Sequence, residues 1–136
     1  MAKPPKTKIR PIPDPWLERV IPLLEQGDPN KILWSVRAQS NWQEFGMKHE
    51  AYPLCLEVLT SAAPLGEEIF TMTDRKDHSV CETWAFPCPH PLNKGTYLYA
   101  KIGLHHGRLH INLFSLHVDL SGDLVSAIRT YLKSKK

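Results

Sequence analysis

The side chains that can carry charge or exchange a proton gather in the second half of the chain, around segments with the pattern of β-strands. A carboxylate, an imidazole, a phenol and cations on one sheet can cleave RNA without a metal. A base removes the 2′-hydroxyl proton, a cation stabilises charge at phosphorus, and an acid protonates the leaving oxygen. The residues available for these roles are Arg75, Lys76, His78, Glu82, Tyr99, Lys101, His105, His106, His110 and His117.

A β-hairpin is predicted over residues 96–118, where apolar and polar residues alternate with period two. His106 and Gly107 suit a two-residue turn, because glycine readily adopts positive φ. Position 104 then faces 109, 102 faces 111, 100 faces 113 and 98 faces 115. This register puts leucines and isoleucines on one face and Tyr99, Lys101, His110 and Asn112 on the other. A solvated sheet face without function explains the same alternation.

Three helices are expected before the sheet and one after it. The apolar spacing places them at residues 14–26, 32–42, 52–61 and 124–132, with Asp14 as the cap of the first and Gly27 at its end. Strands are expected at 68–73 and 79–86, ahead of the hairpin. The predicted fold class is α+β, with N-terminal helices packed on a mainly antiparallel sheet and a C-terminal helix.

The length of 136 residues predicts one domain, over residues 14–132. Residues 1–13 read as a flexible, basic, Pro-rich arm, and 133–136 as a basic tail. The net charge of +3 is concentrated in these two ends. No segment has the pattern of a signal peptide or a membrane span, so a cytoplasmic protein without a membrane partner is expected.

Three cysteines are too few and too odd in number for a disulfide framework, which suits a reducing compartment. A metal site can be imagined from His78, Cys81, Cys88 and His90, but their spacing matches no closed zinc pattern. Neither a metal nor another cofactor is therefore expected.

Three segments resemble the C-terminal half of the MqsR toxins. They are residues 77–82 (DHSVCE), 95–102 (GTYLYAKI) and 111–117 (INLFSLH), and the similarity extends over roughly residues 15–118. MqsR toxins are RelE-like, metal-independent mRNA interferases of toxin–antitoxin modules. The resemblance implies a RelE-like sheet, single-stranded mRNA as substrate and a protein antitoxin as partner.

Carried over by position, the resemblance implies a catalytic set. Tyr99 falls on the family's active-site tyrosine, and Lys101 on the lysine two residues later. Glu82 falls on a catalytic glutamine and His117 on a catalytic lysine, which makes Glu82 the expected base and His117 the expected acid. The family's other active-site lysine has no counterpart here, and Arg75 or Lys76 would replace it. The predicted substrate-binding residues are Arg75, Lys76, His78, His110 and Asn112.

The position of His117 decides between alternatives. In a regular strand it shares the apolar face, and a β-bulge near residues 114–116 would bring it to the side of Tyr99. Convergence of Glu82, Tyr99, Lys101 and a histidine on one face would indicate an enzyme. Dispersal would indicate a non-catalytic interaction module that keeps a toxin-like sheet. A third alternative is an RNA-binding protein that uses its basic tails without cleavage.

Overall fold

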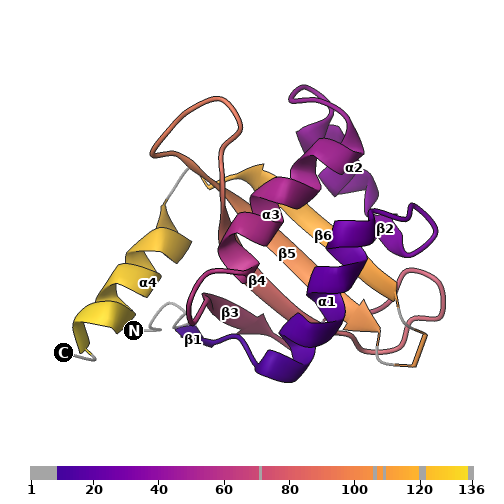
Figure 1. The fold of residues 1–136 in the computed structure, drawn as a ribbon, viewed down its shortest axis with the longest axis horizontal. Coiled ribbons are helices and arrows are strands. Elements are labelled where there is room, and N and C mark those ends of the chain that lie inside the picture. The colour runs from indigo at the N-terminus through magenta and orange to yellow at the C-terminus, as the bar shows by residue number, and fades with distance from the viewer. Residues whose placement is uncertain (1–8, 71, 106, 109, 120–121, 135–136) are drawn as a thin grey trace, which may run out of the picture.

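Six strands form one sheet in the order β1-β3-β4-β5-β6-β2 (Figure 1). All neighbours are antiparallel except β2 and β6, which are parallel. The computed structural model describes residues 9–70, 72–105, 107–108, 110–119 and 122–134. The strands are β1 (Ile9–Pro11), β2 (Ile32–Trp34), β3 (Leu65–Ile69), β4 (Glu82–Pro89), β5 (Tyr97–His105) and β6 (His110–Val118).

The helices cover one face of this sheet and one of its ends. In Figure 1, α1 and α3 cross in front of the strands, while α4 stands apart beside β1 and β3. Within the described part of the chain, no helix has both the length and the apolar character to cross a membrane. The helices are α1 (Asp14–Gln26), α2 (Val36–Trp42), the short 3₁₀ helix η1 (Lys48–Glu50), α3 (Ala51–Leu59) and α4 (Asp123–Ser134).

The predicted α+β class with a mainly antiparallel sheet and a C-terminal helix is confirmed, but the helices do not all precede the strands. Ile32–Trp34, expected to be helical, form β2 and pair with β6. The helix begins only after Ser35, whose hydroxyl caps the Ala38 N–H at 3.0 Å. Asp14 is the first residue of α1 and not its cap, because Pro13 holds the cap position.

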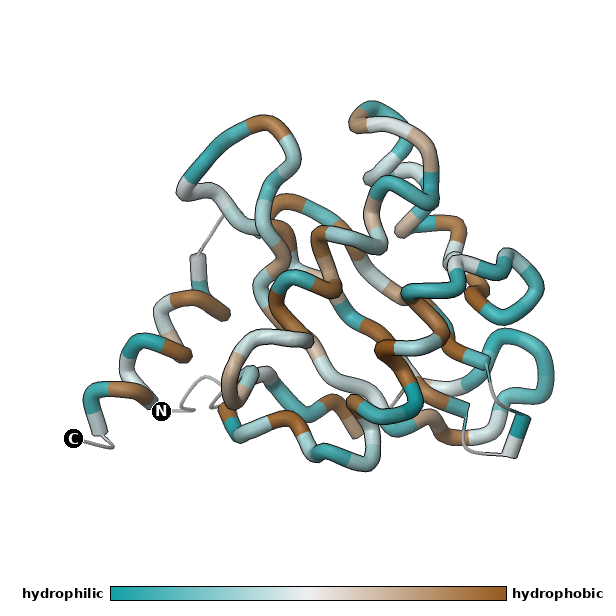
Figure 2. Tube along the Cα trace, in the orientation of Figure 1, coloured by the Kyte–Doolittle hydropathy of each residue, from teal (hydrophilic) through white to brown (hydrophobic). Residues whose placement is uncertain are grey.

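The core lies between the sheet and α1 with α3. Residues 98, 100, 102 and 104 of β5 are fully buried and face these helices together with Trp84 and Phe86. The Trp16 indole N–H donates to the Glu82 carbonyl at 2.8 Å, which ties α1 to the start of β4. Hydrophobic and hydrophilic residues alternate along α4, whose Leu124 is buried (Figure 2).

Two expectations about the chain ends and loops are wrong. Residues 9–11 are not part of a flexible arm, because β1 pairs with β3 and Ile9 and Ile12 are buried; residues 1–8 lie outside the described part. The strand expected at 79–86 lies at Glu82–Pro89 instead, so Pro87 and Pro89 belong to β4. Pairing of β4 with β3 ends at Ala85, so these prolines remove no hydrogen bond to β3.

The hairpin β5–β6 has a longer connection than expected. His105 pairs with His110 and Leu104 with Ile111, so the turn is two residues longer, and the predicted register is wrong by two positions as far as Leu113 and by three positions beyond it. The predicted faces hold as far as Leu113, because a shift of two positions keeps each side chain on its side of the sheet. His106 and Leu109 lie outside the described residues.

Candidate active site

A β-bulge at Phe114 decides which side chains share the open face of the sheet. Ile102 pairs with Leu113, but the next pair is Lys101 with Ser115, so Phe114 is one residue in excess. The register beyond the bulge puts His117 opposite Tyr99. The β-bulge needed to bring His117 to the side of Tyr99 is therefore present.

The bulge is held from two directions. The Ser35 hydroxyl donates to the Phe114 carbonyl at 2.8 Å, and the Ser35 N–H donates to the Leu113 carbonyl at 3.0 Å. On the other side, a Cβ placed on Gly103 would lie 2.6 Å from Cε2 of Phe114. The Phe114 ring therefore occupies the space that the side chain of any other residue at position 103 would fill.

Four side chains meet on this face and form what we call the Tyr99 cluster: Glu67, Tyr99, Lys101 and His117. The Tyr99 and His117 rings are stacked, with centroids 5.3 Å apart and planes at 16°. The Tyr99 hydroxyl donates to Oε1 of Glu67 at 3.3 Å. The Lys101 ammonium lies 5.9 Å from the Tyr99 ring centroid. A carboxylate, a phenol, an ammonium and an imidazole thus come together from three strands.

The electrostatics of the Tyr99 cluster favour an anionic ligand. Burial raises the pKa of the Tyr99 hydroxyl, and the Glu67 carboxylate raises it further, so the phenol stays protonated and donates. Burial lowers the pKa of Lys101; Glu67 opposes this change and the Arg37 guanidinium of α2 adds to it. Lys101 is half-buried, and an anion placed between it and the exposed Arg37 would relieve the repulsion between these two cations.

Glu82, the expected base, is not brought into the cluster. It pairs with the buried Leu104 and so lies on the helix-covered face, opposite Tyr99. Sequence reasoning missed Glu67 because the strand was expected to begin at Glu68. With β3 at Leu65–Ile69, Glu67 pairs with Ala85 and shares the face of Lys101.

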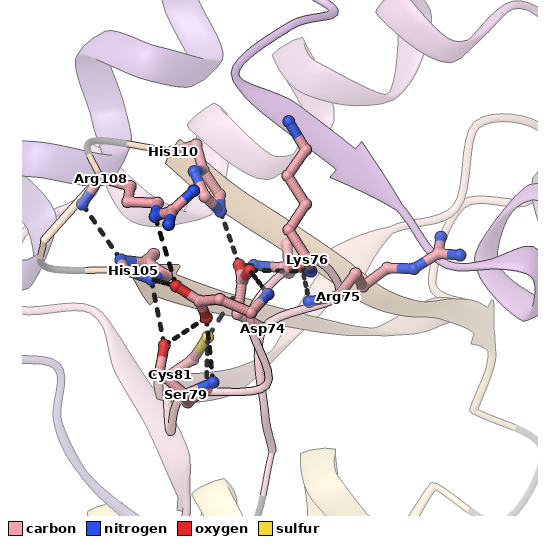
Figure 3. A network of polar contacts seen from close by, with 10 residues as sticks. Asp74, Arg75, Lys76, Ser79, Cys81, His105, Arg108 and His110 are labelled. Atoms are coloured by element: carbon pink, nitrogen blue, oxygen red, sulfur yellow. Dashed lines mark hydrogen bonds and ion pairs between the residues drawn. The ribbon is translucent and has the colours of Figure 1, made fainter.

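A second polar group, here called the aspartate network, lies at the other end of the hairpin (Figure 3). It consists of Asp74, Asp77, His105, His110 and Asn112. Asp74 is fully buried and accepts hydrogen bonds from His110 Nε2 at 2.6 Å and Asn112 Nδ2 at 2.8 Å. Its other oxygen accepts the Lys76 and Asp77 N–H groups at 2.9 and 3.1 Å. Burial alone would raise the pKa of Asp74, but these donors outweigh it and hold the pKa well below its usual value.

Asp77 anchors the same turn at the surface. It accepts from the Ser79 hydroxyl at 2.7 Å and the Ser79 N–H at 3.0 Å, and its second oxygen contacts His105 Nε2 at 2.7 Å and Arg108 Nε at 3.3 Å. The Ser79 donors, followed by His105, lower the pKa of Asp77 to about 2. His105, which directly precedes the predicted turn, is the last residue of β5 and is buried.

Ser79, His105 and Asp77 do not form a nucleophilic triad. His105 Nδ1 accepts the Arg108 N–H at 3.1 Å, so a neutral ring carries its hydrogen on Nε2. Asp77 and Ser79 both contact this same Nε2, the latter at 3.0 Å. A protonated Nε2 cannot take the hydroxyl proton of Ser79, which nucleophilic catalysis would require.

The predicted substrate-binding residues are mostly committed to this network. His110 and Asn112 are buried beneath the turn and held by Asp74. The Arg75 backbone N–H donates to Oδ1 of Asn112 at 3.2 Å, and its guanidinium donates to the Trp34 carbonyl. Lys76 and His78 are exposed on the turn, His78 with φ of 60°. The turn is thus fixed to the sheet through the contacts of Asp74 and Arg75.

The possible metal ligands are also engaged within the protein. Among the described residues, Asp74, Asp77 and His105 place ligand atoms within 4.8 Å of one another, but these atoms hold the hydrogen bonds given above. Of the cysteines, Cys88 lies in the core with its sulfur 4.0 Å from that of Cys55. His90 Nδ1 accepts the Leu92 N–H at 3.0 Å.

Comparisons with known proteins do not assign the chain to a family. No family model matches the sequence, and neither curated proteins nor solved structures give a significant match. The resemblance to the MqsR toxins remains an interpretation of short motifs, so a functional proposal must rest on the geometry of the Tyr99 cluster.

Proposed function

We propose that this protein is a metal-independent endoribonuclease of the mRNA-interferase type, with a RelE-like sheet, that cleaves single-stranded mRNA. The observation that carries the proposal is the stacked pair of Tyr99 and His117, which brings an imidazole beside a phenol, a lysine and a carboxylate. These are the groups that cleavage through the 2′-hydroxyl requires.

In the proposed reaction, Glu67 takes the 2′-hydroxyl proton and the 2′-oxygen attacks phosphorus. The bond to the 5′-oxygen breaks, and His117 protonates this leaving group. The products are a 2′,3′-cyclic phosphate and a free 5′-hydroxyl. Lys101 and Arg37 stabilise the negative charge on the phosphoryl oxygens. Tyr99, which contacts both Glu67 and His117, positions the phosphate.

The proposed setting is a type II toxin–antitoxin module in the cytoplasm. A protein antitoxin would cover the open face of β5 and β6 and keep RNA away from the Tyr99 cluster. Inhibition of translation would then follow from release of the antitoxin.

A non-catalytic interaction module is the second candidate, and the position of Glu82 favours it. The expected base lies on the other face of the sheet, so the complete set carried over from the MqsR toxins does not converge. An interaction module needs only the exposed surface of the sheet and no proton transfer.

The test is incubation of the full-length protein with a long single-stranded RNA in the presence of EDTA. Fragments ending in cyclic phosphate, absent with the His117→Gln variant, are expected of the endoribonuclease. RNA that stays intact at high protein concentration, both free and in translating ribosomes, would favour the interaction module.

A further inference from the structure

A hollow of about 540 Å³ lies between α2 and the end of β6, next to the Tyr99 cluster. His117 connects the two, because its ring is stacked on Tyr99 and also lines the hollow. A nucleotide whose phosphate lies at Lys101 and Arg37 would therefore have its base within reach of this hollow. The lining residues are Arg37, Asn41, Glu44, Phe45, His117 and Val118.

Phe45 gives the hollow a fixed aromatic wall. Its ring packs against Trp42 with centroids 5.6 Å apart, and against His90 at 5.0 Å in an edge-on arrangement. Unpaired RNA bases stack on aromatic side chains, and this contact tolerates every base. Phe45 is therefore suited to hold a base but not to select one.

Glu44 is the unexpected member of the lining. A carboxylate repels phosphate and accepts hydrogen bonds, so Glu44 in this lining suits the part of a ligand that offers N–H donors. Guanine offers two adjacent donors, N1–H and the N2 amino group, which match the two oxygens of one carboxylate. Adenine and cytosine present a single amino group on the corresponding edge, and uracil a single N–H.

Asn41 complements this arrangement. Its side-chain amide supplies a donor that guanine O6 can accept. In the part of the chain that the structure describes, no hydrogen bond occupies the side chain of either Asn41 or Glu44. Both groups are therefore available to a base that enters the hollow.

We propose that this hollow is a guanine-binding subsite, and that Glu44 makes the protein select RNA with guanosine next to the scissile phosphate. The inference rests on the proposed ribonuclease function and adds its base specificity. It assigns a polar role to a loop residue that lies outside the Tyr99 cluster.

The experiment measures binding and cleavage separately on the full-length protein. Nuclear magnetic resonance titrations with the four nucleoside 3′-monophosphates are expected to give the tightest binding for guanosine 3′-monophosphate. Glu44→Gln should reduce this preference roughly tenfold or more, as expected for loss of a bidentate base contact. Phe45→Leu should weaken all four nucleotides alike. Glu25→Gln, the same change at an exposed residue of α1, is the matched control and should alter nothing.

Cleavage sites are then mapped on an RNA of mixed sequence with wild type and Glu44→Gln. Equal binding of the four nucleotides, or an unchanged preference in Glu44→Gln, would overturn the guanine subsite. Preferential binding of guanosine 3′-monophosphate without RNA cleavage would overturn the ribonuclease and keep the subsite. Cleavage without base preference by both wild type and Glu44→Gln would overturn the guanine subsite and keep the ribonuclease.

Discussion

Tyr99 and His117 stack on the open face of the sheet because Phe114 adds one residue to β6 between them and the turn. In a regular strand, His117 would lie on the buried face with Ile111 and Leu113, and Leu116 would lie on the open face. The extra residue changes the side on which every later residue of β6 lies. The bulge at Phe114 thus brings His117 into the Tyr99 cluster. It is held by the hydrogen bond from Ser35 and by the Phe114 ring, which fills the space left by the missing side chain of Gly103.

Glu67 and Glu82 give the sharpest test of which carboxylate acts as the base. Glu67→Gln removes a carboxylate that touches Tyr99, and we expect RNA cleavage to fall by about 10²–10⁴-fold, as is typical for loss of a general base. Glu82→Gln, on the other face, should retain cleavage close to wild type. Rates on a defined RNA with EDTA present give the comparison. The reverse pattern would restore Glu82 as the base.

Lys101 should contribute to RNA affinity through its charge. Lys101→Ala is expected to weaken binding of an uncleavable 2′-deoxy substrate and to lower the slope of log K against log salt by about 0.7, the value for one phosphate contact on a single strand. Lys133→Ala removes the same charge from an exposed position on α4 and is the control. Filter binding at several salt concentrations measures both. Equal slopes for the two variants would exclude a specific phosphate contact at Lys101.

The sheet could be predicted from the sequence because apolar residues alternate along its central strand β5. Leu98, Ile102 and Leu104 are fully buried as that alternation requires, and Tyr99 and Lys101 lie on the opposite face. The register of the hairpin could not be predicted. It depends on the pairing of His105 with His110, and these histidines are held by Asp77 and Asp74, which come from a turn far upstream in the sequence.

The candidate site was predictable in part for the same reason. The shared face of Tyr99 and Lys101 could be predicted from the alternation of the hairpin. His117 joins them only through a bulge, which the sequence permits but does not predict. Glu67 could not be selected, because residues 65–69 are short and carry glycine and two glutamates, a weak strand pattern. Its place beside Tyr99 is set by pairing across β4, which no local pattern reveals.

The aspartate network should make the stability of the protein depend on pH in the acid range. The pKa of Asp74 is lowered in the folded state, and that of Asp77 is lowered from 3.8 to about 2. Both carboxyls therefore bind protons more readily in the unfolded chain. Their contribution is fully present above the unfolded pKa and is lost as the pH falls from about 5 through 2.

Urea unfolding between pH 7 and pH 2.5 measures this dependence. Asp74→Asn should destabilise the protein by about 2 kcal/mol at neutral pH, because an amide N–H₂ would face donors that now share a carboxylate. It should also flatten the loss of stability in acid. Asp14→Asn, at an exposed position of α1, is the control for the charge change. An unchanged acid profile in Asp74→Asn would contradict the role of this network.

Gly103 should tolerate no side chain, because three neighbours occupy the space of its missing Cβ. That atom would lie 2.6 Å from Phe114 Cε2, 2.7 Å from Thr83 Oγ1 and 3.0 Å from the Cys81 Cβ. Gly103→Ala is expected to lower the free energy of unfolding by about 1–3 kcal/mol. Gly107→Ala, whose Cβ would meet nothing closer than 3.4 Å, is the control.

The same substitution connects stability to the proposed activity. The added methyl group pushes on the Phe114 ring at the bulge, which sets the position of His117 opposite Tyr99. We therefore expect Gly103→Ala to reduce RNA cleavage even at temperatures where the variant is fully folded, as measured by circular dichroism beside each assay. Combining it with Phe114→Leu should recover part of both losses, since the smaller side chain leaves room for the methyl group. Full cleavage by a destabilised Gly103→Ala protein would show that the bulge does not position the catalytic histidine.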